Sequence, residues 1–344
     1  MLAAMTDDVA RLTAALAPLF HELGVDDLHL TKLDAHGVSH DHFAVRGQPW
    51  LVRAPKLSQL DLGAEAQMAL QVAAFERAAP SGASPRLIAT APVTQALPLG
   101  ALIVERIEGA APDGPTHLPA IARALAGIHA LPLPEPDARP PIPEPTAPFK
   151  ALAARAHATF ETYLPGAGLS RAATRIVQER MRWLSDFASQ HVDPGPVTLC
   201  VTDAHPGNFV IRRDGRAVFV DLEKPAYNLP GLDLAHAVIA VAAGWDPTAG
   251  MQPDAAARDG FVKAWMAAVP AEIAERTAPL ILAARQAVWL RTFGFFLRWR
   301  TESQADGPWS ATRLGPGAAA HFRRHVEASL DDEAIRSAAE AWTA

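Results

Sequence analysis

The sequence predicts an α+β fold in which a small, β-rich amino-terminal part precedes a larger, mainly helical part. Short β-prone runs, separated by turns that contain glycine or proline, crowd the first third of the chain. From Phe149 onward apolar residues recur at helical spacing, and a single hairpin pattern, FVIRRDGRAVFV, interrupts them. A length of 344 residues is long for one domain and suits two lobes that share a cleft.

The amino-terminal part is expected to hold five strands and one helix. Its first β-prone runs predict strands near 28–33, 42–46 and 50–53. The stretch LGAEAQMALQVAAFERAAP carries Met68, Val72 and Phe75 at helical spacing and ends at a proline, which predicts a helix. The runs PRLIATAP and GALIVERIEG then predict two more strands. These elements would form a compact, mostly antiparallel lobe.

The remaining sequence predicts helices around one hairpin. The stretch HLPAIARALAGIHALPLP indicates a helix that ends at proline. Prolines dominate 131–148, which predicts an extended surface loop because proline removes backbone hydrogen-bond donors. Further helices are expected near 150–163, 170–190, 232–243, 255–268, 271–300 (broken at Pro279 or Gly294) and 318–341.

Composition excludes several classes of protein. A formal net charge of −6 argues against nucleic-acid binding, which needs a basic face. The lone cysteine, Cys200, excludes an internal disulfide and fits a reducing compartment. The amino end has acids where a signal peptide has cations, and no run of about twenty uncharged apolar residues occurs. We therefore expect a cytoplasmic protein that acts on small molecules, with no membrane contact. The sequence gives no indication of its oligomeric state.

Oxygen-bearing side chains lie at the ends of the predicted hairpin. Asn208 precedes its first strand and Asp221 follows its second, so the hairpin should bring the two together. A carboxylate and an amide oxygen side by side suit Mg²⁺. Asp203 lies just upstream on the same loop and is placed to accept a proton from a hydroxyl. A base followed by two magnesium ligands is the arrangement that phosphoryl transfer from Mg·ATP requires.

These residues carry a resemblance to a known family. The stretch TDAHPGNFVI…GRAVFVDLEKPAYNLPGLDLAHA resembles the aminoglycoside phosphotransferase and choline kinase-like family. The resemblance implies a protein-kinase-like, two-lobed fold with Asp203 as catalytic base and Asn208 and Asp221 as magnesium ligands. It also implies that Glu223 is an auxiliary acid. His205 matches a frequent histidine of the family and is expected to hydrogen-bond the loop.

The same resemblance implies roles for residues that precede the hairpin. The segment LDAHGVSHDHFAVRGQPWLVRAPK is similar to the family's phosphate-binding turn and the strand after it. Gly37 would let the backbone approach phosphate, and Ser39 would offer a hydroxyl at the same turn. Arg53 would grip the α- and β-phosphates, with Glu65 holding it in an ion pair.

The hinge between the lobes follows from the resemblance as well. The backbone of Glu105 to Ile107 would hydrogen-bond adenine, which places an ATP-binding lobe at residues 1–107 and a catalytic, acceptor-binding lobe at 108–344. Asp233 would anchor the catalytic loop. The expected activity is Mg-dependent transfer of the ATP γ-phosphoryl group to a hydroxyl of a small metabolite such as an amino alcohol, a sugar or an aminoglycoside-like compound.

The chain departs from the family pattern at a few positions. Val201 replaces the histidine two residues before the base, His36 or Ala35 replaces the first glycine of the phosphate turn, and His40 replaces the usual asparagine after the serine. These departures leave a second hypothesis open, that of a catalytically impaired pseudokinase or scaffold protein that binds nucleotide.

The acceptor pocket is expected among the carboxyl-terminal helices. Trp289 and Phe293 fall on one helical face and would either cage a cationic acceptor or form core. Trp245 and Asp246 could likewise pair an aromatic ring with an acid. The late helices also carry several arginines, which hint at a less cationic acceptor: Arg285, Arg291, Arg298 and Arg300.

Overall fold

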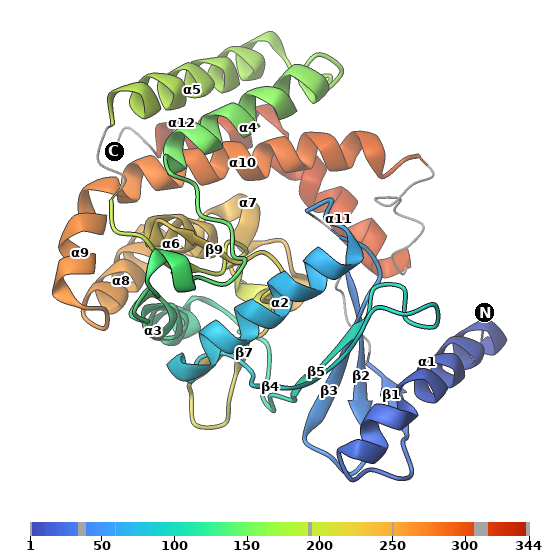
Figure 1. The fold of residues 1–344 in the computed structure, drawn as a ribbon. Helices are drawn as coiled ribbons and strands as arrows, with labels where there is room; N and C mark the ends of the chain where they lie inside the picture. The colour runs from blue at the N-terminus through green and yellow to red at the C-terminus, as the bar shows by residue number, and fades with distance from the viewer. Residues whose placement is uncertain are drawn as a thin grey trace.

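The computed structural model describes residues 2–33, 39–58, 60–191, 195–249, 251–305 and 316–341. Its amino-terminal part is a five-stranded antiparallel sheet in the order β1-β2-β3-β5-β4. The strands are β1 (Leu30–Lys32), β2 (His40–Val45), β3 (Trp50–Pro55), β4 (Leu87–Ala91) and β5 (Ala101–Glu105). The remainder is mainly helical and lies on one side of this sheet (Figure 1).

The two faces of the sheet carry different side chains because strand residues alternate in direction. One face packs on helix α1 (Leu2–Glu22), and its apolar cluster joins Leu16 and Phe20 of the helix to alternate residues of the strands, namely Phe43, Val45, Val52, Ala101 and Ile103. The opposite face carries His42 and Arg53, which lie opposite each other in the register of β2 and β3. This polar face lines a large cavity.

Helix α2 (Ala64–Ala78) lies across the polar face of the sheet, between the two parts of the molecule (Figure 1). All five predicted strands and this helix are present, with ends shifted by a few residues. The predicted lobe boundary at residue 107 falls between β5 and α3 (Leu118–His129). It stays a prediction, because one apolar cluster joins α2 and β5 to α3 across it.

The helices of the carboxyl-terminal part follow the predicted pattern, with two differences. The predicted 232–243 helix is split at Ile239, and the 318–341 helix is split at Leu330, because Asp331 caps a new helix by accepting from the Glu333 amide. The long helix is broken at the short turn containing Pro279 and continues through Gly294. The observed helices are α4 (Pro148–Tyr163), α5 (Arg171–Gln190), α6 (Pro230–Val238), α7 (Ala240–Ala243), α8 (Ala255–Met266), α9 (Ala271–Thr277), α10 (Ile281–Glu302), α11 (Pro316–Ser329) and α12 (Asp332–Glu340).

The predicted hairpin is present. Strands β7 (Phe209–Ile211) and β8 (Ala217–Phe219) pair antiparallel around a turn in which Gly215 has φ +79°. Such a left-handed conformation suits glycine, which has no Cβ to clash with the backbone. A second small ladder pairs β6 (Thr198–Cys200) with β9 (Ala226–Asn228), so the strands on either side of the hairpin also meet.

The long apolar helical stretch is part of the protein core. Residues Ala271–Glu302 are the one described stretch that is long and apolar enough to cross a membrane, and 72% of its most apolar window is buried inside the fold. Within α10, residues such as Leu290 and Phe293 are fully buried against the neighbouring helices α4 and α5. Burial of this kind is what the central helix of a helical core requires.

The packing of α1 on the sheet gives a stability prediction. Phe20 is fully buried and its ring lies 6.2 Å from that of Trp50. Phe20→Ala should lower the free energy of unfolding by about 3–5 kcal/mol, because it removes buried apolar contacts and leaves a cavity. Urea denaturation followed by circular dichroism measures this, with Glu22→Ala at an exposed site of the same helix as control. A loss below about 1 kcal/mol would show that α1 is not part of the folded core.

Candidate active site

A cavity of about 1050 Å³ separates the polar face of the sheet from the carboxyl-terminal helices. Most residues that the sequence singled out line it: Ser39, Arg53, Glu105, Ile107, Asp203, His205, Asn208, Asp221, Glu223, Trp245 and Asp246. Gly37 lies outside the described residues. Glu65 is exposed on α2, and neither it nor Trp289 nor Phe293 lines the cavity.

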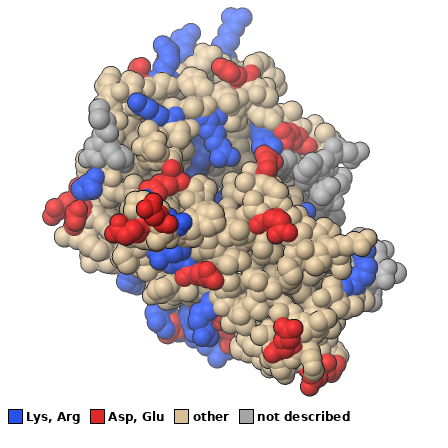
Figure 2. Space-filling view, viewed as in Figure 1, with Lys and Arg blue, Asp and Glu red and all other residues tan. Residues whose placement is uncertain are grey.

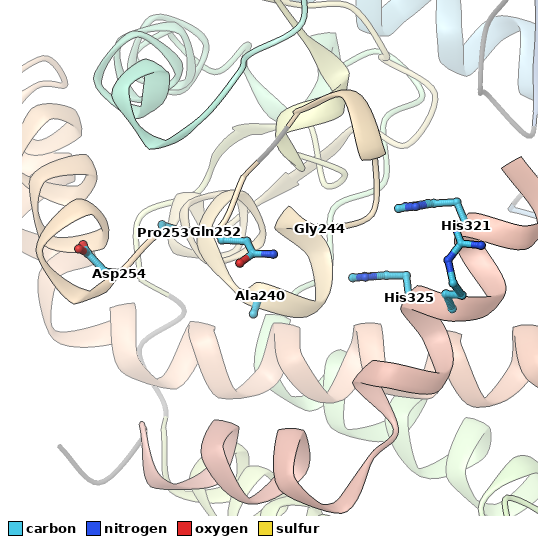
Figure 3. Close-up of a pocket in the computed structure, with 8 residues that line it drawn as sticks. Ala240, Gly244, Gln252, Pro253, Asp254, His321 and His325 are labelled. Carbon is cyan, nitrogen blue, oxygen red and sulfur yellow. The ribbon is translucent and has the colours of Figure 1, made fainter. Parts of the chain in front are cut away.

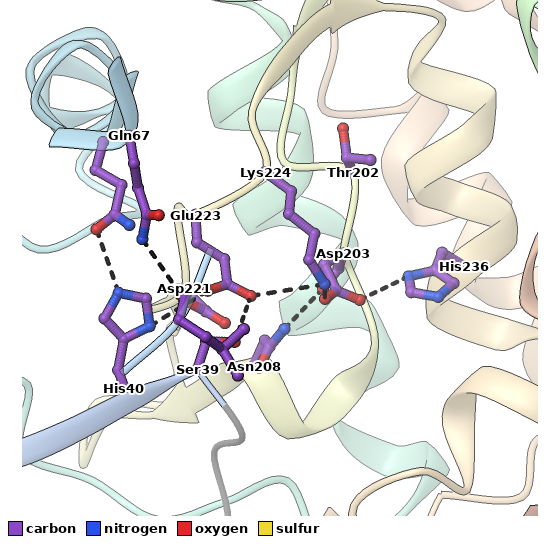
Figure 4. Close-up of polar contacts among 12 residues, drawn as sticks. Ser39, His40, Gln67, Thr202, Asp203, Asn208, Asp221, Glu223, Lys224 and His236 are labelled. Carbon is purple, nitrogen blue, oxygen red and sulfur yellow. Dashed lines mark hydrogen bonds and ion pairs between the residues drawn. The ribbon is translucent and has the colours of Figure 1, made fainter. Parts of the chain in front are cut away.

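The hairpin brings Asn208 and Asp221 to one wall of this cavity. The amide of Val220 donates to the carbonyl of Asn208 at 2.9 Å and so pairs these two residues at the open end of the hairpin. Asp221 is the residue directly after Val220. Nδ2 of Asn208 donates to the carbonyl of Asp203 at 2.9 Å (Figure 4). That bond fixes the amide plane and leaves Oδ1 as the atom that can act as a ligand. Both side chains therefore present oxygen atoms to the same cavity.

Asp203 is a partly buried carboxylate next to Lys224 and two histidines. Nζ of Lys224 donates to its Oδ2 at 2.6 Å, and Nδ1 of His236 lies 3.6 Å from its Oδ1 (Figure 4). Burial acts to raise the pKa of Asp203, but Lys224, His205 and His236 outweigh it, and the net pKa lies well below the usual value. Asp203 is thus ionised at neutral pH and able to accept a hydrogen bond from a hydroxyl.

The loop that carries Asp203 is held from behind by Asp233 at the start of α6. The two carboxylate oxygens of Asp233 accept from the amides of Val201 at 2.7 Å and Thr202 at 2.8 Å. Thr202 has φ +65°, an unfavourable backbone conformation for a residue with a Cβ. Nε2 of His129 lies 3.1 Å from the same carboxylate, and Nε1 of Trp265 donates to the other nitrogen of His129 at 3.0 Å. Asp233 therefore anchors the loop that carries Asp203, as the family resemblance implied.

This anchor gives a second prediction. Asp233 and His129 are fully buried, and an asparagine at 233 can no longer accept with both side-chain atoms. Asp233→Asn should therefore lower the free energy of unfolding by about 3 kcal/mol or more. Chemical denaturation measures the loss, and Asp254→Asn at an exposed helix cap is the matched control. Equal stability of the two variants would show that the buried carboxylate does not hold the loop.

Arg53 is held differently from the prediction. Its guanidinium donates to Oδ1 of Asp221 at 2.5 Å and to the carbonyl of Val220 at 2.8 Å. The predicted ion pair with Glu65 is wrong, since Glu65 points to solvent and the acid that Arg53 reaches is on the hairpin. Helix α2 instead contributes Phe75, whose ring centre lies 5.6 Å from the guanidinium carbon, a cation–π contact.

Ser39 and Glu223 meet at one side of the cavity. The Ser39 hydroxyl donates to Oε1 of Glu223 at 3.3 Å, and Nδ1 of His40 lies 3.2 Å from Oε2 (Figure 4). Nε2 of His40 is 3.3 Å from the side-chain oxygen of Gln71 on α2. His40, Asp221 and Glu223 each have a ligand atom within 4.8 Å of the others, so these three groups could also hold a metal ion.

His42 lies on the same face of β2 as His40. Burial, with Arg53 and His40 close by, lowers its pKa from 6.5 to about 3. In the unfolded chain His42 gains a proton as the pH falls below 6.5, whereas in the folded protein it stays neutral until about pH 3. Acidification below pH 6.5 therefore stabilises the unfolded state relative to the folded state, because only the unfolded His42 takes up the proton.

The corresponding prediction concerns pH. The free energy of unfolding should fall between about pH 6.5 and 5, and His42→Gln should reduce that fall by roughly 1 kcal/mol, because one proton fewer is taken up on unfolding. Urea titrations at several pH values test it, with the exposed His29→Gln as control. The same pH slope in His42→Gln and in the control would contradict the prediction.

The hinge segment lines the cavity where the nucleotide base is expected. The amides of Glu105 and Arg106 donate to the carbonyls of Arg86 and Pro49, so the sheet itself holds this part of the segment in place. Ile107 follows as the next residue on the cavity wall. Its role and that of Glu105 in adenine binding stay predictions.

On the acceptor side, the aromatic stripe on α10 belongs to the core. Trp289 is 3% exposed and Phe293 is fully buried, stacked on each other at 4.7 Å between ring centres. The expectation that they cage an acceptor is therefore wrong, and the alternative that they form core is confirmed. Trp245 lines the cavity but stacks on Phe322 at 4.2 Å, and Asp246 accepts from the amide and hydroxyl of Thr248.

Gly207 lies where the turn before Asn208 meets the segment that carries Asp246. A Cβ at position 207 would collide with the Cβ and carboxylate of Asp246, so only glycine allows the two segments to approach. His205, two residues earlier, makes an edge contact with the ring of His236 at 6.2 Å. Its Nδ1 has no hydrogen-bond partner within the described residues, so that nitrogen does not make the loop hydrogen bond that was expected of His205.

A second cavity, of about 520 Å³, lies between α7, the segment before α8, and α11 (Figure 3). Two histidines one turn apart on α11 point into it. Nε2 of His321 donates to the carbonyl of Trp245 at 3.1 Å, and Nε2 of His325 to that of Val241 at 2.9 Å. These bonds tie α11 to the turn that carries Trp245. We interpret this cavity as structural packing and the larger one as the candidate active site.

Several site residues were not anticipated from the sequence. Lys224 and His236, which contact Asp203, are far from it along the chain, and Phe75 was taken only as a core position. His42 could have been found, because it alternates with His40 and must share its face of the strand. The arginine of α4 that lines the cavity, Arg155, gave no signal in the sequence.

Comparisons with known proteins place the chain in a family. The model of the phosphotransferase enzyme family (APH) matches residues 31–276, so the chain belongs to this family. A search of curated proteins found no match. The sheet followed by a mainly helical part is the fold of this family, which confirms the predicted protein-kinase-like class.

Solved structures of similar fold cover nearly the whole chain. A choline/ethanolamine kinase family protein from Mesorhizobium loti matches with TM-score 0.60 and 19% identity, over 99% of this chain and 100% of its own. A candidate aminoglycoside phosphotransferase from Ralstonia eutropha matches with TM-score 0.61 and 16% identity, over 94% and 98%. LicA, a choline kinase from Streptococcus pneumoniae, matches in its complex with AMP with TM-score 0.52 and 17% identity, over 93% and 99%.

Proposed function

We propose that this protein is a small-molecule kinase that transfers the γ-phosphoryl group of ATP to a hydroxyl of a small metabolite, with Mg²⁺ as cofactor. The observation that carries the proposal is the placement of Asp203, Asn208 and Asp221 on one wall of a single large cavity. An ionised carboxylate next to two oxygen ligands is what phosphoryl transfer needs.

The donor set fits a magnesium ion. Oδ1 of Asn208 and the carboxylate of Asp221 are hard oxygen donors on adjacent ends of the hairpin, with the carboxylate of Glu223 close to Asp221. We propose that Asn208 and Asp221 hold the ion and that Glu223 assists. A bound magnesium would neutralise the charge of the phosphates.

The nucleotide would occupy the side of the cavity under the sheet. We propose that the backbone of Glu105 to Ile107 binds adenine, that Arg53 binds the α- and β-phosphates, and that Ser39, with Gly37, lies at the γ-phosphate end. The AMP complex of LicA supports nucleotide binding in a protein of this fold. Arg53 would then release Asp221, and its ion pair with that carboxylate would be replaced by an ion pair with phosphate.

The acceptor would enter from the side of α4 and α10. Asp203 would orient its hydroxyl and receive the proton as the phosphoryl group is transferred. Lys224 now donates to the same carboxylate, so the acceptor hydroxyl must displace or share that bond. Amino alcohols, sugars and aminoglycoside-like compounds are the acceptor classes to examine.

A second candidate function is a pseudokinase that binds nucleotide without turnover. It is favoured by one observation, namely that both acids expected to act in catalysis are held by cations of the chain. Arg53 pairs with Asp221 at 2.5 Å, and Lys224 pairs with Asp203 at 2.6 Å.

Two variants separate the candidates. Asp203→Asn should lower turnover by about 10²–10⁴-fold while Mg·ATP binding stays within a few fold, because only the proton acceptor is lost. Asp221→Asn should weaken Mg·ATP binding itself. ADP release over a panel of alcohols, amino alcohols and sugars, together with calorimetric titration of Mg·ATP, measures both. Asp214→Asn on the exposed turn of the same hairpin is the control. Mg·ATP binding without ADP release from any acceptor would favour the pseudokinase.

A further inference from the structure

Cationic side chains gather on the acceptor side of the active-site cavity. Arg155 of α4 and Arg291 and Arg298 of α10 line it there. Figure 2 shows lysine and arginine side chains in and beside a hollow next to these helices. Of the other late arginines, Arg300 pairs with Glu327 and does not line the cavity.

The packing of α4 on α10 brings Arg155 and Arg291 to the same level. Gly294 permits this packing, since a Cβ there would lie 3.1 Å from Cγ2 of Thr159. The two helices run in the same direction at this contact, because the hydroxyl of Tyr163 bonds Glu302 further along both of them. Arg155 lies one turn before Thr159 on α4. Arg291 lies about one turn before Gly294 on α10, so the two arginines are at the same level. Burial lowers the pKa of Arg291, Asp203 and Asp233 act to raise it, and the charge of the nearby Arg155 lowers it further.

Within the described residues, neither Arg155 nor Arg291 forms an ion pair with a carboxylate, although the charges of Asp203 and Asp233 act on Arg291. Arg298 pairs with Glu302 at 3.0 Å, which accounts for that acid. Arg291 donates to the carbonyl of Thr202 at 3.1 Å, and Arg155 has no acidic partner within the described part of the chain. Asp246, beside the Trp245 that packs on α10, accepts from the amide and hydroxyl of Thr248.

We infer that the acceptor carries an anionic group, a carboxylate or a phosphate, that Arg155 and Arg291 bind while its hydroxyl lies at Asp203. This inference rests on the proposed function. Guanidinium groups bind such oxyanions through paired, charge-assisted hydrogen bonds. Arg291 bonds Thr202, the residue directly before Asp203. In the acceptor molecule, the anionic group and the reacting hydroxyl would therefore be only a few bonds apart. Hydroxy acids and phosphorylated polyols have that form.

The aromatic residues considered as a cage for a cationic acceptor do not form one. The aromatic residues proposed as a cage, Trp289 and Phe293, are buried in the core. One face of Trp245 is covered by Phe322. An alkylammonium group on the α4–α10 side would thus meet the guanidinium groups of Arg155 and Arg291.

The test compares acceptors of one carbon skeleton. Glycerate, glycerol 3-phosphate, glycerol and 3-amino-1,2-propanediol are assayed for ADP release, and the two anions are also titrated calorimetrically into the Mg·ADP-saturated protein. We expect turnover and saturable binding for glycerate, for glycerol 3-phosphate or for both, and the stronger of the two identifies the anionic group. Arg155→Gln should raise KM and Kd for that anion roughly tenfold or more, with kcat within about threefold. Arg155→Lys should recover part of the loss.

The matched control is Lys150→Gln, an exposed cation on the same helix that does not line the cavity, and it should change nothing. Preference for the amino alcohol, absence of anion binding in the wild type, or equal constants in Arg155→Gln and wild type would each overturn the inference. If Mg·ATP binds and the amino alcohol is phosphorylated, the proposed function stands and only this inference fails. If Mg·ATP does not bind, the proposed function itself fails.

Discussion

The candidate active site depends on one buried carboxylate. Asp233 accepts the amides of Val201 and Thr202 and thereby keeps Thr202 in a left-handed conformation that a side chain disfavours. That conformation turns the chain so that the next residue, Asp203, faces the cavity. His129 and Trp265 extend the same hydrogen-bonded chain into the core. The position of the proposed base is therefore fixed by the core packing of α3, α6 and α8, and not by the loop alone.

The charges of the cavity are arranged in pairs across the two parts of the molecule. Arg53 of the sheet reaches Asp221 of the hairpin, and Ser39 and His40 reach Glu223. These contacts join the sheet to the carboxyl-terminal part. Nucleotide binding would exchange some of them for contacts to phosphate and metal, so affinity for Mg·ATP reflects the difference between two sets of ionic contacts rather than one set alone.

Much of this could be predicted from the sequence, for a physical reason. The five strands, the hairpin and most helices follow from short-range patterns, and Asn208 and Asp221 are brought together by a hairpin whose turn is local. What could not be predicted depends on contacts between distant segments. Glu65 was a reasonable partner for Arg53 by position along α2, but the helix presents Phe75 to it instead. The split at Leu330 and the approach of Arg155 to Arg291 likewise depend on how helices pack.

The contact between Gly207 and Asp246 links two parts of the site that are usually considered separately. Gly207 precedes the proposed metal ligand Asn208, and the backbone there touches the segment that forms one wall of the acceptor space. Substitutions that enlarge the side chain at 207 or reshape the segment of Asp246 would push directly on the turn that carries the proposed metal ligand. If the proposed roles hold, changes of acceptor specificity at this wall are constrained by metal binding.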